Sequence, residues 1–263
     1  MPRQARLSSG TGIYHVMLRG INHQNIFEEP EDYYQFLNTL DMMAQSYEPD
    51  GTPSGRNYTL YAYCLMSNHI HLLIREREDK IGMAIKRIAS SYVYYYNHKY
   101  SRDGHLFRER FKSEVVNDMA YFVTLLRYIH QNSVKAGMVK EVKDYEFSSW
   151  HEYIDKNSTL FPLCDTRTVL NRIPFSELNE LVNEPLSDDI VCLDIEDASK
   201  GRPSDDQVMM LIREKTGATN SSAFQQLPDE IRRSVLIELK DKRASLRQLE
   251  RLTGIGKSMI YRM

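Results

Sequence analysis

Apolar residues recur along the first 140 positions with two different periods, and these periods predict seven regular elements. Apolar residues that alternate with polar ones, or form short runs, predict strands at residues 13–19, 58–65, 69–75 and 110–116. Apolar residues spaced three and four apart predict helices from about 31 to 45, 79 to 99 and 118 to 136. The resulting order is strand, helix, strand, strand, helix, strand, helix.

That order is typical of a single antiparallel sheet with helices packed on one face. It predicts an α+β domain of the ferredoxin-like type over residues 1–153. A polar stretch rich in Pro and Gly at 48–57 predicts a loop within this domain. Residues 154–206 show little periodicity, and their acidic run at 187–204 predicts a linker or lid.

Residues 207–263 are predicted to be helical again and form a second domain. A helix is expected at 229–241, and Ser245 with Gln248 forms a capping box that opens another at 246–252. A turn at 253–256 then leads into a short last helix, so this stretch is similar to a helix-turn-helix, whose second helix enters the major groove of DNA. The side chains expected to face DNA are Arg247, Lys257, Ser258, Tyr261 and Arg262. The alternative is a small helical bundle that packs on the first domain or dimerises.

The net charge conceals an uneven distribution along the chain. The 263 residues carry 34 Lys and Arg against 36 Asp and Glu, and a formal charge of -2 by itself argues against a polyanionic partner. Yet residues 80–140 hold 11 basic and 4 acidic side chains, residues 207–263 hold 11 and 6, and residues 154–206 hold 5 and 12. Two basic zones thus flank an acidic stretch, a pattern compatible with nucleic-acid binding.

The composition excludes several other classes of protein. No run approaches the 18 or more apolar residues of a membrane span, and the first residues lack the apolar centre of a signal peptide. We therefore expect a cytoplasmic protein with no membrane partner. The three cysteines, Cys64, Cys164 and Cys192, are odd in number and far apart, which predicts reduced structural thiols and no cysteine-rich metal site.

Two histidines alternate on the third predicted strand. Side chains two apart on a strand share a face, so His69 and His71 point one way while Ile70, Leu72 and Ile74 point into a core. The histidines are expected to look outward together. Two adjacent imidazoles can bind one divalent metal ion if a further oxygen or nitrogen ligand arrives from elsewhere. The alternative is a pair of half-exposed sheet histidines with no ligand.

The helix predicted at 118–136 presents a polar face that could complete such a site. At about 100° per residue, Tyr128 points away from the apolar stripe that contains Leu126 and Ile129. Asn132 follows one turn later on the same face, and Lys135 lies one turn further along. The alternative is a surface tyrosine among ordinary polar neighbours.

Four segments together resemble a known family. YHVMLRG, AYCLMSNHIHLL, GHLFRERFKSE and RYIHQNSVKAG, in this order and spacing, are similar to the single-tyrosine HUH transposases, among them the REP-associated tyrosine transposases of bacteria. The resemblance covers about residues 1–153; Ser133 departs from it, because relatives often have proline there. It implies a ferredoxin-like HUH domain that cuts and rejoins single-stranded DNA beside hairpins. The resemblance implies repetitive palindromic DNA elements as partners. It also implies a location at the bacterial nucleoid and a protein that is a monomer or homodimer.

The resemblance also implies roles for individual residues. His69 and His71 would be ligands of Mg²⁺ or Mn²⁺, and Tyr128 would be the nucleophile. The third metal ligand in relatives is a polar side chain about one turn after the tyrosine; Asn132 fits that spacing, and Gln131 is the neighbour that could substitute. A tyrosine with a pKa near 10 is ionised to only about one part in a thousand at neutral pH, so it needs a polarised target. The expected product is a 5′-phosphotyrosyl link with a free 3′-hydroxyl.

Further residues are candidates for contacts with DNA. Residues 92–102 hold five of the 17 tyrosines among cationic side chains, and some of these rings could stack on unpaired bases while others face the core. Contacts with the DNA backbone are expected from a set of cationic side chains that comprises Arg19, Arg108, Arg110, Lys112 and Lys135.

The sequence therefore favours a metal-dependent enzyme that nicks DNA and transfers strands. A catalytically silent DNA-binding regulator with the same fold is the leading alternative. A metal hydrolase that uses His69, His71 and water is a third possibility, and it would form no covalent adduct with DNA.

Overall fold

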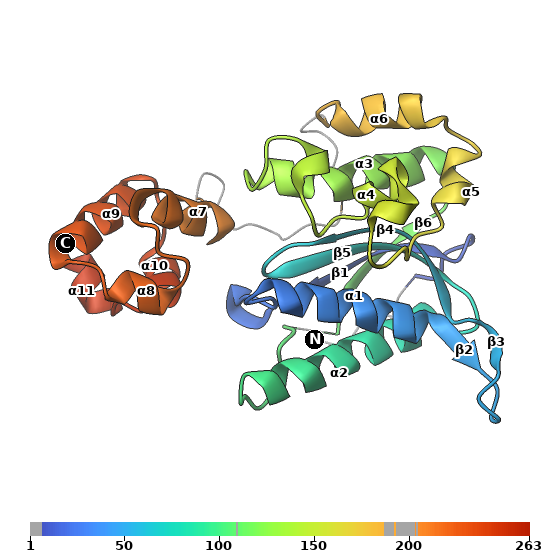
Figure 1. The fold of residues 1–263 in the computed structure, drawn as a ribbon, viewed down its shortest axis with the longest axis horizontal. Coiled ribbons are helices and arrows are strands. Elements are labelled where there is room, and N and C mark those ends of the chain that lie inside the picture. Colours follow the sequence, from blue (N-terminus) through green and yellow to red (C-terminus); the bar gives the residue numbers. More distant parts are fainter. Residues whose placement is uncertain (1–6, 109, 187–191, 193–202, 204) are drawn as a thin grey trace. The chain divides into compact units, whose positions relative to one another are not determined.

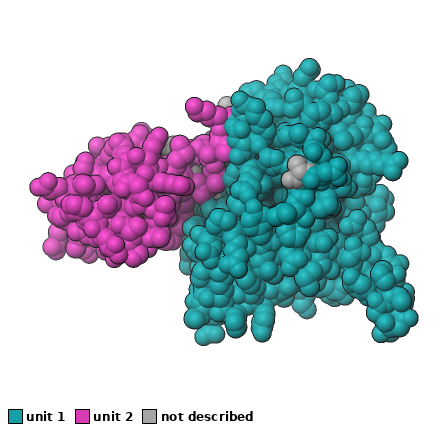
Figure 2. Space-filling view, in the orientation of Figure 1, with its two compact units in different colours: residues 1–133, 141–194 teal, residues 134–140, 195–263 magenta. Residues whose placement is uncertain are grey.

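The computed structural model describes residues 7–108, 110–186, 192, 203 and 205–263 (Figure 1). The chain forms two compact units, one of residues 1–133 and 141–194 and the other of residues 134–140 and 195–263 (Figure 2). Each unit has its own hydrophobic core, so each can be described by itself.

A four-stranded antiparallel sheet forms the centre of the first unit. Its strands are β1 (Ile13–Arg19), β4 (Tyr58–Leu65), β5 (His69–Glu76) and β6 (Lys112–Val116), and their spatial order is β4-β5-β1-β6. The first strand thus lies between two strands that follow it much later in the chain, which is the ferredoxin-like arrangement. The predicted α+β fold class is confirmed, and each predicted strand matches its observed bounds to within two residues.

Two long helices cover one face of this sheet. They are α1 (Pro30–Ala44) and α2 (Ile81–Lys99), and their buried apolar side chains pack against Ile70, Leu72 and Ile74 of β5. A capping box starts α1, because the side chains of Glu29 and Asp32 each accept a hydrogen bond from the other's backbone amide. This face holds the larger core of the molecule.

The opposite face is covered as well, which differs from the expectation of helices on one face only. The helix α3 (Met119–Lys135) lies over it (Figure 1). The ring of Phe122 on this helix meets Tyr61 of β4 edge-on, with 5.2 Å between ring centroids. Every residue of β4 is buried, so other elements must pack on both faces of the sheet. The sequence correctly predicted α3 but not the face on which it packs.

Residues that were expected to form a linker instead fold onto the first unit. After α4 (Trp150–Ile154), the chain forms α5 (Thr166–Leu170) and α6 (Phe175–Asn183). The amide of Asp165 donates to the carbonyl of Leu60 on the edge strand β4 at 2.8 Å. The segment therefore covers the edge of the sheet. Apart from Cys192 and Pro203, the acidic run at 187–204 lies outside the described residues.

A second difference is a small hairpin that overlaps the predicted loop at 48–57. The strands β2 (Gln45–Tyr47) and β3 (Pro53–Arg56) pair with each other and form a sheet of their own. No helix among the described residues is long and apolar enough to cross a membrane.

The second unit is helical, as the sequence predicts. Its helices are α7 (Asp205–Thr216), α8 (Ser221–Gln225), α9 (Asp229–Asp241), α10 (Leu246–Thr253) and α11 (Lys257–Tyr261). The expected capping box is present, because Ser245 Oγ accepts from the amide of Gln248 and Gln248 Oε1 accepts from the amide of Ser245. Gly254 ends α10 with a φ of 68°, a left-handed conformation that favours glycine.

Candidate catalytic site

Three histidines lie on the sheet face that α3 covers. The register pairs Arg19 with His69 and Met17 with His71, so alternate residues of β1 and β5, including His15, point to this face. His69 and His71 share a face as predicted, yet both are buried, with exposed fractions of 8% and 0%. The expectation that they look outward is wrong, because α3 packs over them.

Tyr128 points from α3 toward these histidines. Its ring meets the ring of His71 edge-on, with 5.6 Å between centroids, and lies 5.9 Å from the ring of His15. The side chain is only 4% exposed. A surface tyrosine is therefore excluded: α3 is buried on more than one side, so both its apolar stripe and Tyr128 are covered.

The two candidates for a third ligand have different surroundings. Asn132 is buried one turn after Tyr128, and its Nδ2 donates to the carbonyl of Tyr128 at 2.9 Å. Its Oδ1 is thus the atom that could serve a cation. The side chain of Gln131 points elsewhere, because its Nε2 donates to the carbonyls of Val182 and Glu184 at 2.7 Å. The contacts favour Asn132 over Gln131.

The residues present fit a divalent cation. The Nδ1 of His69 bonds to Oδ1 of Asn68 at 2.7 Å, and the Nδ1 of His71 bonds to Nε2 of His15 at 2.9 Å. The nitrogen of each histidine that could bind a cation is therefore Nε2, and the two ring centroids are 5.0 Å apart. Among the described residues, no three His, Cys, Asp or Glu side chains form a metal cluster. The amide oxygen of Asn132, which is buried one turn after Tyr128, is the candidate for a further ligand.

Sequence reasoning missed three residues at this site. They are Asn68, His15 and Glu114 on β6, whose Oε2 lies 3.7 Å from Nδ1 of His15. Alternation along β1 places His15 on the same face as Arg19, so a signal existed. The predicted ferredoxin-like fold implies that β1 lies between β5 and β6, and this position brings His15 beside both Glu114 and His71.

A second tyrosine of α3 has a different environment. Burial, together with the neighbouring carboxylate of Glu114, raises the pKa of Tyr121 far above its usual value. Tyr121 therefore stays protonated. Tyr128 instead faces imidazole rings.

Arg19 ends β1 at the edge of this face and contacts the imidazole of His23 in the loop that follows. That loop holds the turn before β5, because the amide of Gly20 donates to the carbonyl of Asn68 at 2.9 Å and Ile26 donates to Ser67 at 2.7 Å. A Cβ atom at Gly20 would lie 2.2 Å from a backbone oxygen of the same loop, which explains the glycine.

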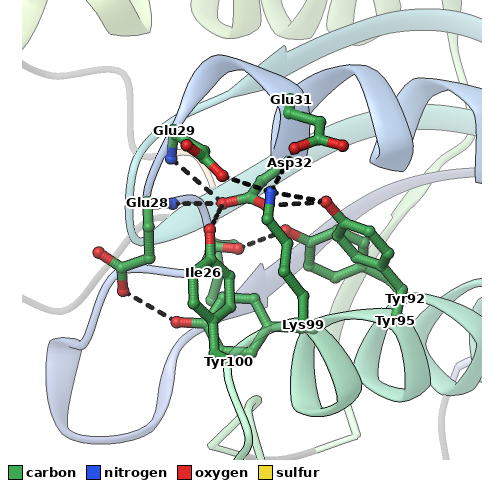
Figure 3. Close-up of polar contacts among 10 residues, drawn as sticks. Ile26, Glu28, Glu29, Glu31, Asp32, Tyr92, Tyr95, Lys99 and Tyr100 are labelled. Atoms are coloured by element: carbon green, nitrogen blue, oxygen red, sulfur yellow. Dashed lines mark hydrogen bonds and ion pairs between the residues drawn. The ribbon is translucent and has the colours of Figure 1, made fainter.

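Most tyrosines of α2 form a polar network and not a surface for stacking bases (Figure 3). Tyr95 and Lys99 donate to Oδ1 of Asp32 at 3.0 and 2.9 Å, and Tyr100 donates to its Oδ2 at 2.7 Å. The hydroxyl of Tyr92 donates to a backbone carbonyl. Burial acts to raise the pKa of Asp32, but hydrogen bonds from Lys99, Tyr100 and two backbone amides outweigh it and lower that pKa.

This network corrects the expectation for residues 92–102. Tyr92 and Tyr96 are fully buried, and Tyr95 and Tyr100 are tied to Asp32. Of the five tyrosines, only Tyr94 is largely exposed, at 77%.

The cationic candidates lie at the surface. Arg108 and Arg110 are exposed, and together with Lys86 they line a pocket of about 510 Å³ that also contains Phe107 and Phe111. Lys112 pairs with Met17 across β6 and β1, so its side chain shares the face of the histidines.

The remaining candidates are also accessible. Lys135 is exposed at the end of α3. In the second unit, Arg247 on α10 and Lys257 and Tyr261 on α11 are exposed.

Residues 9–132, just under half of the chain, match the model of a family described as "Transposase IS200 like". A Haemophilus influenzae protein named "Putative REP-associated tyrosine transposase" is 28% identical over 112 residues, which are 38% of this chain and 62% of that protein. The match thus spans less than two thirds of the relative's length.

One solved structure is also similar. It is described as "Structure of the REP associates tyrosine transposase bound to a REP hairpin", with 19% identity and a TM-score of 0.47 over 63% of this chain and 93% of that one. The fold assignment itself rests on the strand order of this chain.

Proposed function

Because residues 9–132 match the model of the IS200-like transposase family, we propose that this protein cuts and rejoins single-stranded DNA beside hairpins, with Tyr128 as the nucleophile. The relative from Haemophilus influenzae suggests repetitive palindromic elements as the DNA. The observation that carries the proposal is the position of Tyr128. Its buried ring lies against His71 and one turn before Asn132.

The proposed reaction exchanges one phosphodiester bond for another. Tyr128 Oη attacks the phosphorus, so a tyrosine–phosphate bond forms while the bond between phosphorus and the 3′ oxygen breaks. The phenol proton is lost to solvent, and the leaving 3′ oxygen takes one up. Since the product retains a phosphodiester, the 3′-hydroxyl of another strand can reverse the attack without an external energy source.

The residues around Tyr128 position this step. His69, His71 and Asn132 would hold Mg²⁺ or Mn²⁺, which when bound would polarise the scissile phosphate. Burial and the neighbouring carboxylate of Glu114 oppose ionisation of Tyr121, whereas Tyr128 faces the imidazole rings of His71 and His15. The burial of the face limits access of water, which favours transfer to tyrosine over hydrolysis.

Cationic residues of both units would hold the DNA. Arg19 and Lys112 are positioned at the histidine face, and Arg108 with Arg110 could contact phosphates around the pocket that they line. Lys135 could extend this contact. In the second unit, Arg247, Lys257 and Tyr261 would read duplex or hairpin DNA in the manner of a helix-turn-helix.

The deciding experiment detects the covalent intermediate. The full chain is incubated with a set of labelled single-stranded hairpin DNAs and Mn²⁺, and the products are separated on a denaturing gel. We expect a protein–DNA adduct for the wild type and for Tyr94→Phe, whose hydroxyl is exposed on α2, and none for Tyr128→Phe. An adduct of equal yield with Tyr128→Phe contradicts the assignment of the nucleophile.

The same gel separates the alternatives. A silent regulator would bind the hairpins and leave them intact. A metal hydrolase would cut them without an adduct, and Tyr128→Phe would cut equally well.

A separate measurement addresses the second unit. Replacing Arg247 and Lys257 by Ala should weaken binding to hairpin DNA and reduce the slope of log affinity against log salt by about 1 to 2. Arg233→Ala, a change at an exposed cation on α9 outside the helix-turn-helix pair, is the control. Unchanged affinity and slope in the double variant would make this unit an interaction module of another kind.

A further inference from the structure

Three polar side chains form a row across three strands of the sheet. Glu114 on β6 is the register partner of His15 on β1, and His71 on β5 lies diagonally across from His15, one pair along from its register partner Leu73. The Nδ1 of His15 is 3.7 Å from Oε2 of Glu114, and its Nε2 is 2.9 Å from Nδ1 of His71. The two imidazole rings are stacked, with centroids 5.2 Å apart. The row thus ends at a residue assigned to the metal site.

The bond between the two histidines can be made in two ways. A neutral imidazole has one nitrogen that donates and one that accepts. If His71 donates from Nδ1, its Nε2 carries a lone pair that can bind a cation. If His15 donates from Nε2, His71 must accept at Nδ1 and carries its proton on Nε2, where no metal can bind.

The carboxylate of Glu114 selects between these two states. Its negative charge faces Nδ1 of His15, and an N–H there is attracted while a lone pair is repelled. At 3.7 Å the contact is longer than a hydrogen bond, but the side chain of His15 is fully buried, so the interaction is weakly screened. A proton on Nδ1 leaves Nε2 of His15 as an acceptor, which requires His71 to donate.

We propose that Glu114 and His15 are positioning residues that fix the tautomer and orientation of His71, so that its Nε2 can bind the divalent cation of the nicking reaction. The inference rests on the proposed metal site. At His69 the same result is reached by another route, because the amide oxygen of Asn68 accepts from Nδ1 at 2.7 Å. Both histidines would then present Nε2 to the cation. The neutral amide of Asn68 fixes the tautomer of His69, and the charge of Glu114 fixes that of His71 through His15.

The test measures metal affinity and tautomer in the full chain without DNA. Mn²⁺ is titrated into the protein by calorimetry, and the ring nitrogens of His71 are assigned from ¹⁵N chemical shifts in the metal-free state. We expect the Kd for Mn²⁺ to rise about 10- to 100-fold in Glu114→Gln and in His15→Phe. In Glu114→Gln the protonation of His71 should shift from Nδ1 alone to a mixture of Nδ1 and Nε2.

Two controls separate this effect from a general loss of structure. Glu48→Gln makes the same chemical change at an exposed position beside the β2–β3 hairpin and should change neither readout. Glu114 is partly exposed at 35%, so its replacement by Gln should keep the fold even if His15→Phe does not.

The outcomes also distinguish this proposal from the proposed function. If the wild type binds Mn²⁺ through His71, and both variants keep wild-type affinity and the Nδ1 tautomer, the proposed role of Glu114 and His15 is wrong. If the wild type and His71→Ala bind Mn²⁺ equally well, the proposed metal site is wrong. Glu114 and His15 then have no role in metal binding. A tautomer that still depends on Glu114 would then confirm only the hydrogen-bond direction.

Discussion

The two faces of the central sheet are both buried and both carry tyrosines, yet they differ in what the polar groups do. On the face of α1 and α2, tyrosine hydroxyls donate to Asp32 and to backbone carbonyls, and Lys99 supplies the compensating charge. On the face of α3, Tyr128 meets imidazole rings. The first arrangement closes a network around a carboxylate. The second brings Tyr128, the proposed nucleophile, next to His71, a proposed metal ligand.

The difference shows how burial alone misleads. A buried tyrosine whose hydroxyl donates to a carboxylate becomes a weaker acid, as the raised pKa values of Tyr95 and Tyr100 show, because burial and Asp32 both oppose ionisation. The tyrosine-rich stretch 92–102 therefore stabilises the fold, although its composition is typical of a DNA-binding surface. We expect the nucleophile to be a tyrosine that contacts basic groups.

The largest effect should come from the carboxylate at the centre of the α1–α2 network. Asp32→Ala leaves Lys99 and two tyrosine hydroxyls without their shared acceptor and removes the capping box of α1. We expect a loss of about 3 to 5 kcal/mol in the free energy of unfolding, measured in urea. Glu31→Gln, a change at an exposed partner of Lys99, should cost less than about 1 kcal/mol. Equal losses would show that the network is only surface pairing.

A pH dependence should arise on the other side of the sheet. Burial lowers the pKa of His130 on α3 to about 3, so this histidine stays neutral in the folded protein while the unfolded chain takes up a proton near pH 6.5. A depressed histidine pKa costs stability as the pH falls below 6.5. From pH 7 to 5 the loss from His130 should be about 2 kcal/mol.

The measurement is urea unfolding at both pH values for the wild type and His130→Gln. The variant should be less stable at pH 7, because Nε2 of His130 bonds to Ser149 at 2.8 Å, but its stability should fall less on acidification. An identical fall in both proteins would contradict burial of a neutral imidazole. His98→Gln, at an exposed position on α2, is the matched control.

The smallest effect on stability is expected for Tyr128→Phe, which is compared with Tyr100→Phe on the other face of the sheet. Tyr100→Phe removes a hydrogen bond to a carboxylate and should cost about 1.5 to 3 kcal/mol while the covalent DNA adduct still forms. Tyr128→Phe should cost less than about 1 kcal/mol and abolish the adduct. The two variants are compared by urea unfolding and by the adduct gel. If both lost stability to the same extent, the two faces would not differ in the way described.

Much of the first unit could be predicted from the chain. The strands β1, β4 and β5 and the helices α2 and α3 follow from periodicity because each buries a regular row of apolar side chains. Residues 154–186 could not be predicted, because their short helices rely on contacts with the edge of β4 and have little periodicity of their own.

The candidate site divides in the same way. Alternation placed His69 and His71 on one face, and helical spacing placed Tyr128 and Asn132 on another. His15 and Glu114 escaped notice because each is an unremarkable residue on its own strand.

By itself, the sequence determined which residues share a strand or helix face, since that depends only on the local periods of 2 and 3.6. Only the tertiary structure decided which faces meet. The strand order β4-β5-β1-β6 brought Glu114, His15 and His71 into one row, and the packing of α3 turned a pair of histidines expected at the surface into a buried site. The contacts of His15 with His71 and with Glu114 join residues that are 56 and 99 positions apart in the sequence. Such contacts depend on how several apolar surfaces are covered at once, and no local pattern predicts them.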